Sequence, residues 1–438
     1  MRARSERRKN EQIYVSGAEI REEMPATTVN APSAEKQTGN SGSEKGKKKK
    51  GRVGMEDFWI VPSDEILAGN TTDVYFLRTE EVLRKKGINP RVVAEVTASS
   101  LEHGWGVLAG VSDVATLLAG KDLDVYAMPE GTIFFEDEPV LRIEGRYLEF
   151  ARFETPILGF LCHESGIATK AARIKKKAGD VPVISFGTRR QHPALAAVIE
   201  KCAYMGGMDG VSNVAGASRI GIQPMGTMPH SLIICFRSQQ DAWKAFDEIM
   251  PEDVPRICLC DTYYDEKTEA VMAAETLKRL NAVRLDTPSS RRGDFRKIVE
   301  EVRWELDIRG FKNVGIFVSG GIDEAEIEEL RDIVSGFGVG TSVANAKCID
   351  FALDIVEIEG EPCAKRGKKG GKKQVYRKKT EKGFEDFVAI ENSKQHFEGE
   401  PLLKPLILGG KIVEDFPLSL ESARKRVLEQ LKYVTDKE

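Results

Sequence analysis

The sequence has no apolar run that could cross a membrane. No stretch approaches the roughly 20 consecutive apolar residues that a transmembrane helix needs. The N-terminus is charged and has no apolar core, so it does not carry the pattern of a secretory signal. We therefore expect a cytoplasmic protein that has no membrane partner.

Cysteines are few, and their spacing forms no framework. The seven cysteines are scattered through 438 residues, which suits a reducing compartment. Cys258 and Cys260 are one residue apart in a predicted strand, and this spacing favours two buried side chains over a metal site. No second cysteine follows Cys363, and His396 alone cannot complete a tetrahedral zinc site. We predict no zinc.

A strong excess of one charge is also missing. The net charge is −4, which argues against a protein that binds nucleic acid over its whole surface. The segment Met1 to Gly54 is poor in aromatic residues and rich in Lys, Glu, Ser and Gly, so we expect it to be disordered. Its basic run Lys47 to Arg52 is then a solvated tail or a patch for RNA, and the solvated tail is favoured.

The remainder can bury a sizeable core, since 41% of the residues are hydrophobic. From Met55 onward, short β-branched runs at close spacing predict an antiparallel sheet with helices on one face. Helices are expected to end at Gly87 and at Gly179, where glycine is a common stop signal.

From Val181 the pattern changes to strands alternating with helices. Such alternation predicts a parallel sheet, and the number of repeats favours a closed but irregular (β/α) barrel. The candidate strands are 181–187, 210–216, 222–226, 256–262, 282–288, 314–321 and 337–343.

We therefore divide the chain into four segments. They are a disordered basic tail (1–54), an N-terminal α+β sandwich (55–165), a (β/α) barrel (166–354), and a C-terminal segment (355–438). The C-terminal segment contains a Lys/Gly-rich loop and an amphipathic helix that Ser419 is expected to cap.

Polar motifs follow the predicted barrel strands. They read FGTRRQHPA, GGMDGVSN, MGTMPHS, RLDTPSS, FVSGGID and FGVGTSV, in that order. In parallel α/β folds the active groups lie where strands end and loops begin. In this order and spacing, the six motifs resemble the nicotinate phosphoribosyltransferase family in its archaeal-type form, from roughly Glu56 to Arg377.

The resemblance implies a fold and a reaction. The fold is that of type II phosphoribosyltransferases, an irregular, incomplete (β/α) barrel with an N-terminal open-faced α/β sandwich. The reaction joins nicotinate to the phosphoribosyl group of phosphoribosyl pyrophosphate, giving nicotinate mononucleotide for NAD salvage. Its charged transition state needs cations, hydroxyl acceptors and backbone amides held in place. Mg²⁺ would arrive with phosphoribosyl pyrophosphate and keep several waters, so we assign it no protein ligand; Asp261 is a candidate only.

The resemblance implies three catalytic residues. Arg189 would lie at the pyrophosphate and ring end of the site, since guanidinium groups match carboxylate and phosphate geometry. His230 matches the family histidine near the leaving group, which ATP phosphorylates in many relatives, so ATP is a candidate co-substrate. Asp286 would accept hydrogen bonds from the ribose hydroxyls.

Further residues are expected to bind substrate. Phe186 would stack on the pyridine ring, Arg284 would face phosphate, and Ser231 would contact the carboxylate. Asp209 either binds substrate or bonds its own backbone, and both interpretations stay open. The complete substrate-binding set is Asp73, Tyr75, Phe186, Thr188, Asp209, Ser231 and Arg284.

Two glycine-rich strand ends are expected to bind phosphate. Glycine lets the backbone approach a phosphate and expose its N–H groups, and barrels often bind phosphate at their last strands. The residues are Ser319, Gly320, Gly321, Gly338, Gly340 and Thr341.

Asp73 and Tyr75 lie in the string TDVYFLRT, well before the barrel. The alternative to a binding role is a helix-capping Asp73. In relatives this element reaches the neighbouring subunit, so the resemblance implies a homodimer, or a higher homo-oligomer, with composite sites.

Two alternatives remain. One is a sibling enzyme that uses nicotinamide or quinolinate. The other is a non-catalytic, RNA-associated protein that uses the Lys tracts at 47–50 and 368–373, although we expect no nucleic-acid partner.

Overall fold

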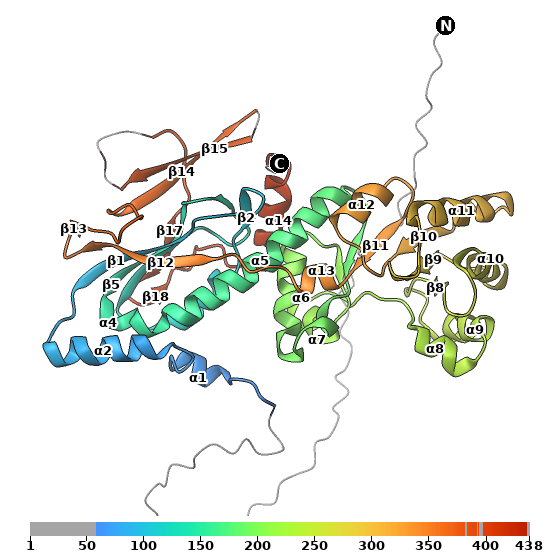
Figure 1. The fold of residues 1–438 in the computed structure, drawn as a ribbon, viewed down its shortest axis with the longest axis horizontal. Helices are drawn as coiled ribbons and strands as arrows, with labels where there is room; N and C mark the ends of the chain where they lie inside the picture. The colour runs from blue at the N-terminus through green and yellow to red at the C-terminus, as the bar shows by residue number, and fades with distance from the viewer. Residues whose placement is uncertain (1–57, 382, 392, 394–396, 436–438) are drawn as a thin grey trace, which may run out of the picture. The chain divides into compact units, whose positions relative to one another are not determined.

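The computed structural model describes residues 58–438 except 382, 392, 394–396 and 436–438. The predicted disorder of residues 1–54, with the run Lys47 to Arg52, and His396 lie outside the described residues. From Ile60 to Glu438 the chain forms one compact unit (Figure 1).

An antiparallel sheet of seven strands forms the first layer of this unit. The strand order is β13-β12-β1-β5-β3-β17-β18. Val96 on the interior strand β1 pairs with Leu141 on one side and Leu353 on the other. The strands are β1 (Arg91–Ala98), β3 (Leu123–Ala127), β5 (Pro139–Arg146), β12 (Phe351–Ile358), β13 (Glu361–Pro362), β17 (Lys404–Leu408) and β18 (Lys411–Ile412). The predicted antiparallel sheet is confirmed, and it takes strands from both ends of the described chain.

The helices near this sheet are α1 (Ser63–Leu67), α2 (Val74–Lys86), α3 (Val111–Leu118), α4 (Tyr147–Phe150) and α5 (Glu154–Ala178). α2 ends at Gly87, which adopts the left-handed conformation (φ 65°) as expected. α5 ends before Gly179, also as predicted. A short pair of strands, β2 (Trp105–Val107) and β4 (Ile133–Phe135), lies apart from the large sheet.

α5 belongs to two hydrophobic cores. Ile157 and Leu161, in its first half, pack in the core of the antiparallel sheet. Ile167 and Ala171, further along, pack in the core of a second, parallel sheet. Because one continuous helix enters both cores, the sheets cannot shift relative to each other without breaking its packing (Figure 1).

The second sheet has six parallel strands in the order β7-β6-β11-β10-β9-β8. They are β6 (Val183–Ser185), β7 (Gly210–Val211), β8 (Ile257–Leu259), β9 (Ala282–Leu285), β10 (Gly315–Val318) and β11 (Gly336–Val339). The helices between and after them are α6 (Ala196–Met205), α7 (Val214–Ile220), α8 (His230–Phe236), α9 (Gln239–Ile249), α10 (Glu266–Thr276), α11 (Phe295–Ile308), α12 (Glu324–Leu330) and α13 (Thr341–Ala344).

The parallel sheet is not closed. β7 and β8 are its edges, and no pairing between them occurs in the described part of the chain. The incomplete barrel is therefore confirmed, and the expectation of a closed one is wrong. The predicted strand 222–226 is also wrong, because only Met225 N–H bonds β7, at Val211 O. Pro224 has no backbone N–H to donate to a neighbouring strand, and this explains why the stretch remains a loop.

The C-terminal part contributes a small sheet and a closing helix. The sheet has the order β15-β14-β16, from β14 (Lys373–Thr380), β15 (Gly383–Ile390) and β16 (Glu400–Pro401). α14 (Leu420–Gln430) begins at Ser419, whose hydroxyl accepts from Ser422 N–H at 3.1 Å, as predicted. The proposed division at residues 55, 166 and 355 stays a prediction, while strands from the last segment complete the first sheet.

The lysines at 368–373 are largely counter-ions for buried carboxylates. Lys373 Nζ lies 2.8 Å from Glu95, and Lys372 Nζ lies 2.8 Å from Glu144. Lys368 Nζ reaches Asp354 at 3.4 Å. This tract is therefore not a free basic surface, so it gives no support to the alternative of an RNA-associated protein. Among the described helices, none is long and apolar enough to cross a membrane.

Glu138 generates a prediction about stability and pH. It is buried before β5, with Asp386 of β15 beside it. Burial, and then the charge of Asp386, hold the pKa of Glu138 well above its ordinary 4.5. The folded protein thus binds a proton that the unfolded chain releases above pH 4.5, so this contribution to stability is lost as pH rises.

We expect the free energy of unfolding of Glu138→Gln to depend less steeply on pH than that of the parent. Its amide keeps the acceptor for Phe135 N–H, which Glu138 binds at 2.9 Å, and donates to Asp386. Between pH 5 and pH 8 the free energy of unfolding should fall by about 1–3 kcal/mol less than in the parent. Denaturant unfolding at several pH values measures this, with the exposed Glu385→Gln as control. Parallel profiles for all three proteins would contradict the assignment.

Candidate functional site

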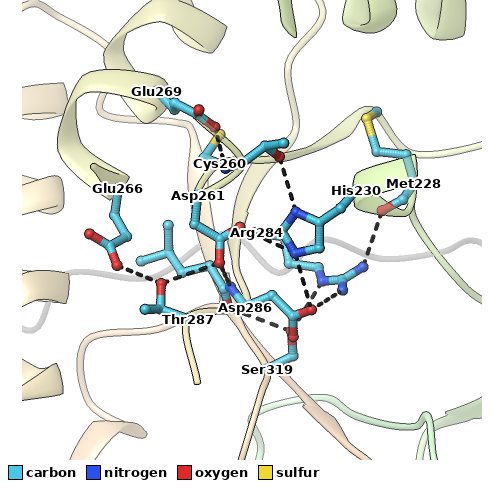
Figure 2. Close-up of polar contacts among 12 residues, drawn as sticks. Met228, His230, Cys260, Asp261, Glu266, Glu269, Arg284, Asp286, Thr287 and Ser319 are labelled. Carbon is cyan, nitrogen blue, oxygen red and sulfur yellow. Dashed lines mark hydrogen bonds and ion pairs between the residues drawn. The ribbon is translucent and has the colours of Figure 1, made fainter. Parts of the chain in front are cut away.

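Polar side chains gather at the carboxyl ends of β8, β9 and β10. Asp261 comes shortly after β8, Asp286 directly after β9, and Ser319 directly after β10. Because these strands are parallel neighbours, their ends meet at one edge of the sheet (Figure 2). His230, the first residue of α8, joins them there.

An ion pair lies at the centre of this cluster. Arg284 Nη2 donates to Asp286 Oδ2 at 2.9 Å, and the two residues share a face because they are two apart on a strand. Arg284 also donates to Ser319 Oγ at 3.0 Å and to Thr227 Oγ1 at 2.6 Å. Ser319 Oγ in turn donates to Asp286 Oδ1 at 2.6 Å. Both oxygens of Asp286 are therefore occupied.

The pKa of Asp286 reflects these contacts. Its burial would raise the pKa, but the contact with His230, the charge of Arg284 and the hydrogen bond from Ser319 outweigh burial. The pKa lies well below its ordinary value, so Asp286 is a carboxylate at any physiological pH.

His230 is held between a hydroxyl and two carboxylates. Its Nδ1 lies 3.1 Å from Thr262 Oγ1. Its Nε2 lies 3.7 Å from Asp286 Oδ2 and 3.8 Å from Asp261 Oδ1. The polar contact with Asp286, aided by the charges of both acids, raises the pKa of His230 despite partial burial. The side chain is 39% exposed, so a ligand in solution can reach it.

Asp261 is the less satisfied carboxylate. Its Oδ2 accepts from Asp286 N–H at 3.0 Å and from Thr287 Oγ1 at 3.2 Å. Its Oδ1 is buried and has no hydrogen-bond partner among the described residues. Burial first, and then the charge of Asp286, raise the pKa of Asp261 to about 6 although His230 lowers it.

Phe186 connects this cluster to β6. Its ring centroid lies 5.7 Å from the Arg284 guanidinium and 6.1 Å from the Phe317 ring. A Cβ on Gly338 would lie 2.4 Å from the Phe186 ring, so this glycine makes room for the aromatic side chain. Gly320, at φ +82°, is required for another reason, because a Cβ there would meet Asp286 O at 2.7 Å.

The loop after β6 carries the unpaired cations. A 3₁₀ turn, η2 (Thr188–Arg190), lies against α13 and leaves Arg189 and Arg190 exposed. Neither side chain has an ion-pair or hydrogen-bond partner in the described chain, although the backbone N–H of Arg190 donates to Gly187 O at 2.9 Å. Thr188 Oγ1 accepts from Asn213 Nδ2 at 3.4 Å. Gly321, Gly340 and Thr341 follow neighbouring strands β10 and β11 along the same edge.

Asp209 is not part of this edge. Its Oδ2 accepts from Lys175 Nζ at 2.8 Å and from Val183 N–H at 2.9 Å, at the start of β6. It therefore lies at the amino ends of the strands, opposite the cluster. The structural interpretation fits these contacts, and we do not retain the substrate-binding one. Ser231 is exposed at the start of α8, next to His230.

Asp73 and Tyr75 are also separate from the cluster within one chain. α2 and the strands β8–β10 lie toward opposite ends of the compact unit (Figure 1). Asp73 Oδ2 accepts from Tyr75 Oη at 3.2 Å and from Thr155 Oγ1 at 3.1 Å. Asp73 occupies the N-cap position, yet its side chain caps no backbone N–H.

Sequence reasoning missed Thr262 and Arg292. Arg292 Nη1 donates to Thr287 O at 3.2 Å and to Gly320 O at 2.9 Å, so it ties the loops after β9 and β10. Its place shortly after the RLDTPSS motif was the available signal. Thr262 had the same kind of signal, because it directly follows Asp261.

Comparison with known proteins gives matches over both sheets. The model of the quinolinate phosphoribosyl transferase C-terminal domain matches residues 167–354, and that of the N-terminal domain matches residues 73–165. A nicotinate phosphoribosyltransferase of Mycobacterium tuberculosis is 34% identical over 325 residues, 70% of this chain and 68% of the relative. One from Bacillus subtilis is 30% identical over 297 residues, 63% of this chain and 57% of that protein.

Solved structures agree on the fold. The nicotinate-nucleotide pyrophosphorylase of Pyrococcus furiosus is 56% identical, with a TM-score of 0.83 over 86% of this chain and 99% of that one. Human nicotinic acid phosphoribosyltransferase is similar in fold, with a TM-score of 0.69 at 19% identity, over 83% of this chain and 94% of that one.

Proposed function

Because the chain belongs to the quinolinate and nicotinate phosphoribosyltransferase family, and is a pyridine phosphoribosyltransferase, we propose that its acceptor is nicotinate. The reaction would give nicotinate mononucleotide and pyrophosphate, a step of NAD salvage. The observation that carries the proposal is the Arg284–Asp286–His230 cluster, which shares a sheet edge with Arg189 and Arg190, whose side chains have no counter-ion among the described residues.

The cluster suits a transition state with a cationic sugar and a departing polyanion. Asp286, kept ionised by Arg284 and Ser319, would stabilise positive charge on the ribose or accept its hydroxyls. His230, whose pKa is raised, would present positive charge to the leaving pyrophosphate. The amides after β10 and β11 would bind the 5′-phosphate.

Phe186 and the unpaired Arg189 suit a ring that bears one carboxylate. An arginine without a partner binds a carboxylate through charge-assisted hydrogen bonds, and an aromatic ring offers a stacking face. Quinolinate carries a second carboxylate, which would need further cations. That alternative is kept because the Pyrococcus furiosus structure, at 56% identity, is named nicotinate-nucleotide pyrophosphorylase.

Mg²⁺ fits the site only loosely. It prefers carboxylate oxygens, and Asp261 Oδ1 is the buried oxygen with no described hydrogen-bond partner. No group of three or more candidate ligands occurs among the described residues. Asp261 would therefore give at most one ligand to a Mg²⁺ that arrives with phosphoribosyl pyrophosphate, where the ion would neutralise phosphate charge.

The placement of Asp73 and Tyr75 supports a homodimer with composite sites. They cannot serve the cluster of their own chain, which lies at the other end of the unit (Figure 1). Val74, Leu77 and Val82 of the same helix are exposed, a surface suited to a second copy. A two-fold axis would bring each α2 to the partner's strand ends.

The acceptor is tested directly. Purified protein receives phosphoribosyl pyrophosphate and Mg²⁺ with nicotinate, nicotinamide or quinolinate, and mononucleotide is measured. We expect nicotinate to exceed nicotinamide in kcat/KM about 10–100-fold, because the neutral amide loses a charge-assisted hydrogen bond of about 1.5–3 kcal/mol. Faster turnover of quinolinate, with release of CO₂, would replace the proposal with the sibling activity.

The coupling to ATP depends on His230. If ATP phosphorylates this histidine, labelled ATP should leave acid-labile label on the parent but none on His230→Asn. Turnover of the parent without any label would leave His230 as an electrostatic group and remove ATP from the reaction, with the acceptor assignment intact.

Composite sites predict complementation. Tyr75→Ala and Arg189→Ala should each be strongly impaired, because stacking is worth about 0.5–1.5 kcal/mol beyond area burial and a charged contact is worth more. After subunit exchange of an equal mixture, activity should return to about a quarter of the parent value, since half of the dimers have one intact site. Verified exchange without recovery would place the site within one chain.

A further inference from the structure

The loop 261–265 carries two groups of the site but has little support from the sheet. It follows β8, an edge strand of the parallel sheet. Asp261 and Thr262, which contact Asp286 and His230, stand at its start. On its outer side this loop has no neighbouring strand in the described sheet, so its backbone donors need other partners.

Glu269 supplies those partners. This residue of α10 is fully buried. Its Oε2 accepts from Thr262 N–H at 3.0 Å, and its Oε1 accepts from the N–H groups of Tyr263 and Tyr264 at 2.7 and 2.8 Å. Gln239 Nε2 donates to Oε1 at 2.8 Å. Figure 2 shows Glu269 projecting from its helix toward the segment that carries Cys260 and Asp261.

In the described chain, only neutral N–H groups contact the buried carboxylate of Glu269. Glu269 has no ion-pair partner in the described chain, so four N–H dipoles stabilise its carboxylate. An arrangement that uses every backbone N–H of a three-residue stretch fixes the backbone of that stretch, because movement would leave a buried carboxylate without its donors.

We propose that Glu269 is a positioning residue for His230. It holds Thr262 so that the hydroxyl meets His230 Nδ1 at 3.1 Å, and the ring then turns Nε2 toward Asp286 and Asp261. The consequence for turnover rests on the proposed function, whereas the orientation of the imidazole does not.

The other edge of the sheet offers a matched control. Glu200 of α6 is also fully buried and accepts from Asn213 N–H at 3.2 Å, in the loop after the edge strand β7. Glu200 makes no described contact with Thr262 or His230. A general loss of a buried carboxylate should therefore affect Glu269→Gln and Glu200→Gln alike, whereas loss of positioning should affect only the first.

The experiment observes the imidazole itself. Histidine labelled with ¹⁵N is incorporated, and the His230 signal is identified by its absence from His230→Asn. At alkaline pH, where the ring is neutral, the parent should show one dominant tautomer, because Thr262 and the carboxylates fix the two nitrogens differently. In Glu269→Gln, whose amide offers one acceptor to four donors, the two nitrogens should average. Glu200→Gln should keep the parent spectrum.

Variants of Thr262 test the contact between Thr262 and His230 without changing the buried carboxylate of Glu269. Thr262→Val should average the His230 nitrogens, and Thr262→Ser should restore the parent signal. In turnover, Glu269→Gln and Thr262→Val should lose about 10–100-fold in kcat with KM for the pyridine within about threefold, because misplacement of a reacting group costs rate more than binding.

The outcomes separate the two ideas. If Glu269→Gln fails to fold, Thr262→Val and Thr262→Ser decide. An unchanged His230 tautomer in Thr262→Val, or the same averaging in Glu200→Gln, overturns the positioning role. A parent protein that turns over no pyridine would refute the proposed function, yet the tautomer measurement would still decide the role of Glu269.

Discussion

The Arg284–Asp286 ion pair is the interaction on which the site depends. It is only partly exposed, and three polar groups of the cluster contact it directly: Ser319 and His230 contact the acid, and Thr227 contacts the guanidinium. Removal of either partner of such a pair leaves a charge without compensation in a poorly solvated place, which costs more than the pair itself contributes. Both partners lie at the end of β9, and Ser319, directly after β10, hydrogen-bonds both of them, so the geometry of the pair and that of the two strand ends are set together.

An open sheet makes this arrangement possible and creates a weakness. A closed barrel would support every loop with two neighbouring strands, but here β7 and β8 have outer edges. Buried glutamates accept the loop N–H groups at those edges: Glu200 from α6, which precedes β7, and Glu269 from α10, which follows β8. The carboxylates thus replace a missing strand, and α5 fixes the same sheet to the rest of the unit by entering both cores.

The sequence predicted what depends on local pattern. Strand ends and the residues after them, such as Asp286 and Ser319, follow from an apolar run that stops at a polar residue. Asp209 was ambiguous because GGMDG both follows a helix and precedes a strand, and only the contact with Val183 places it at the amino end. The segment 222–226 looked like a strand, but Pro224 prevents a ladder. Thr262 and Arg292 lie near predicted site residues in the sequence, but their contacts, like those of Glu269, join separate segments, and the sequence pattern does not specify such contacts.

Two basic clusters of the sequence have opposite environments, and the contrast indicates where an anion binds. Three lysines of the segment 368–373 form ion pairs within the fold: Lys373 with Glu95, Lys372 with Glu144 and Lys368 with Asp354. Their charge is therefore neutralised by acidic residues of the same chain. Arg189 and Arg190 have no carboxylate partner in the described chain, although they lie on the edge that Asp286 shares. Folding does not select unpaired cations at a strand end, because surface arginines add little stability. A polyanionic ligand would give them a partner, and under the proposed function the departing pyrophosphate is such a ligand.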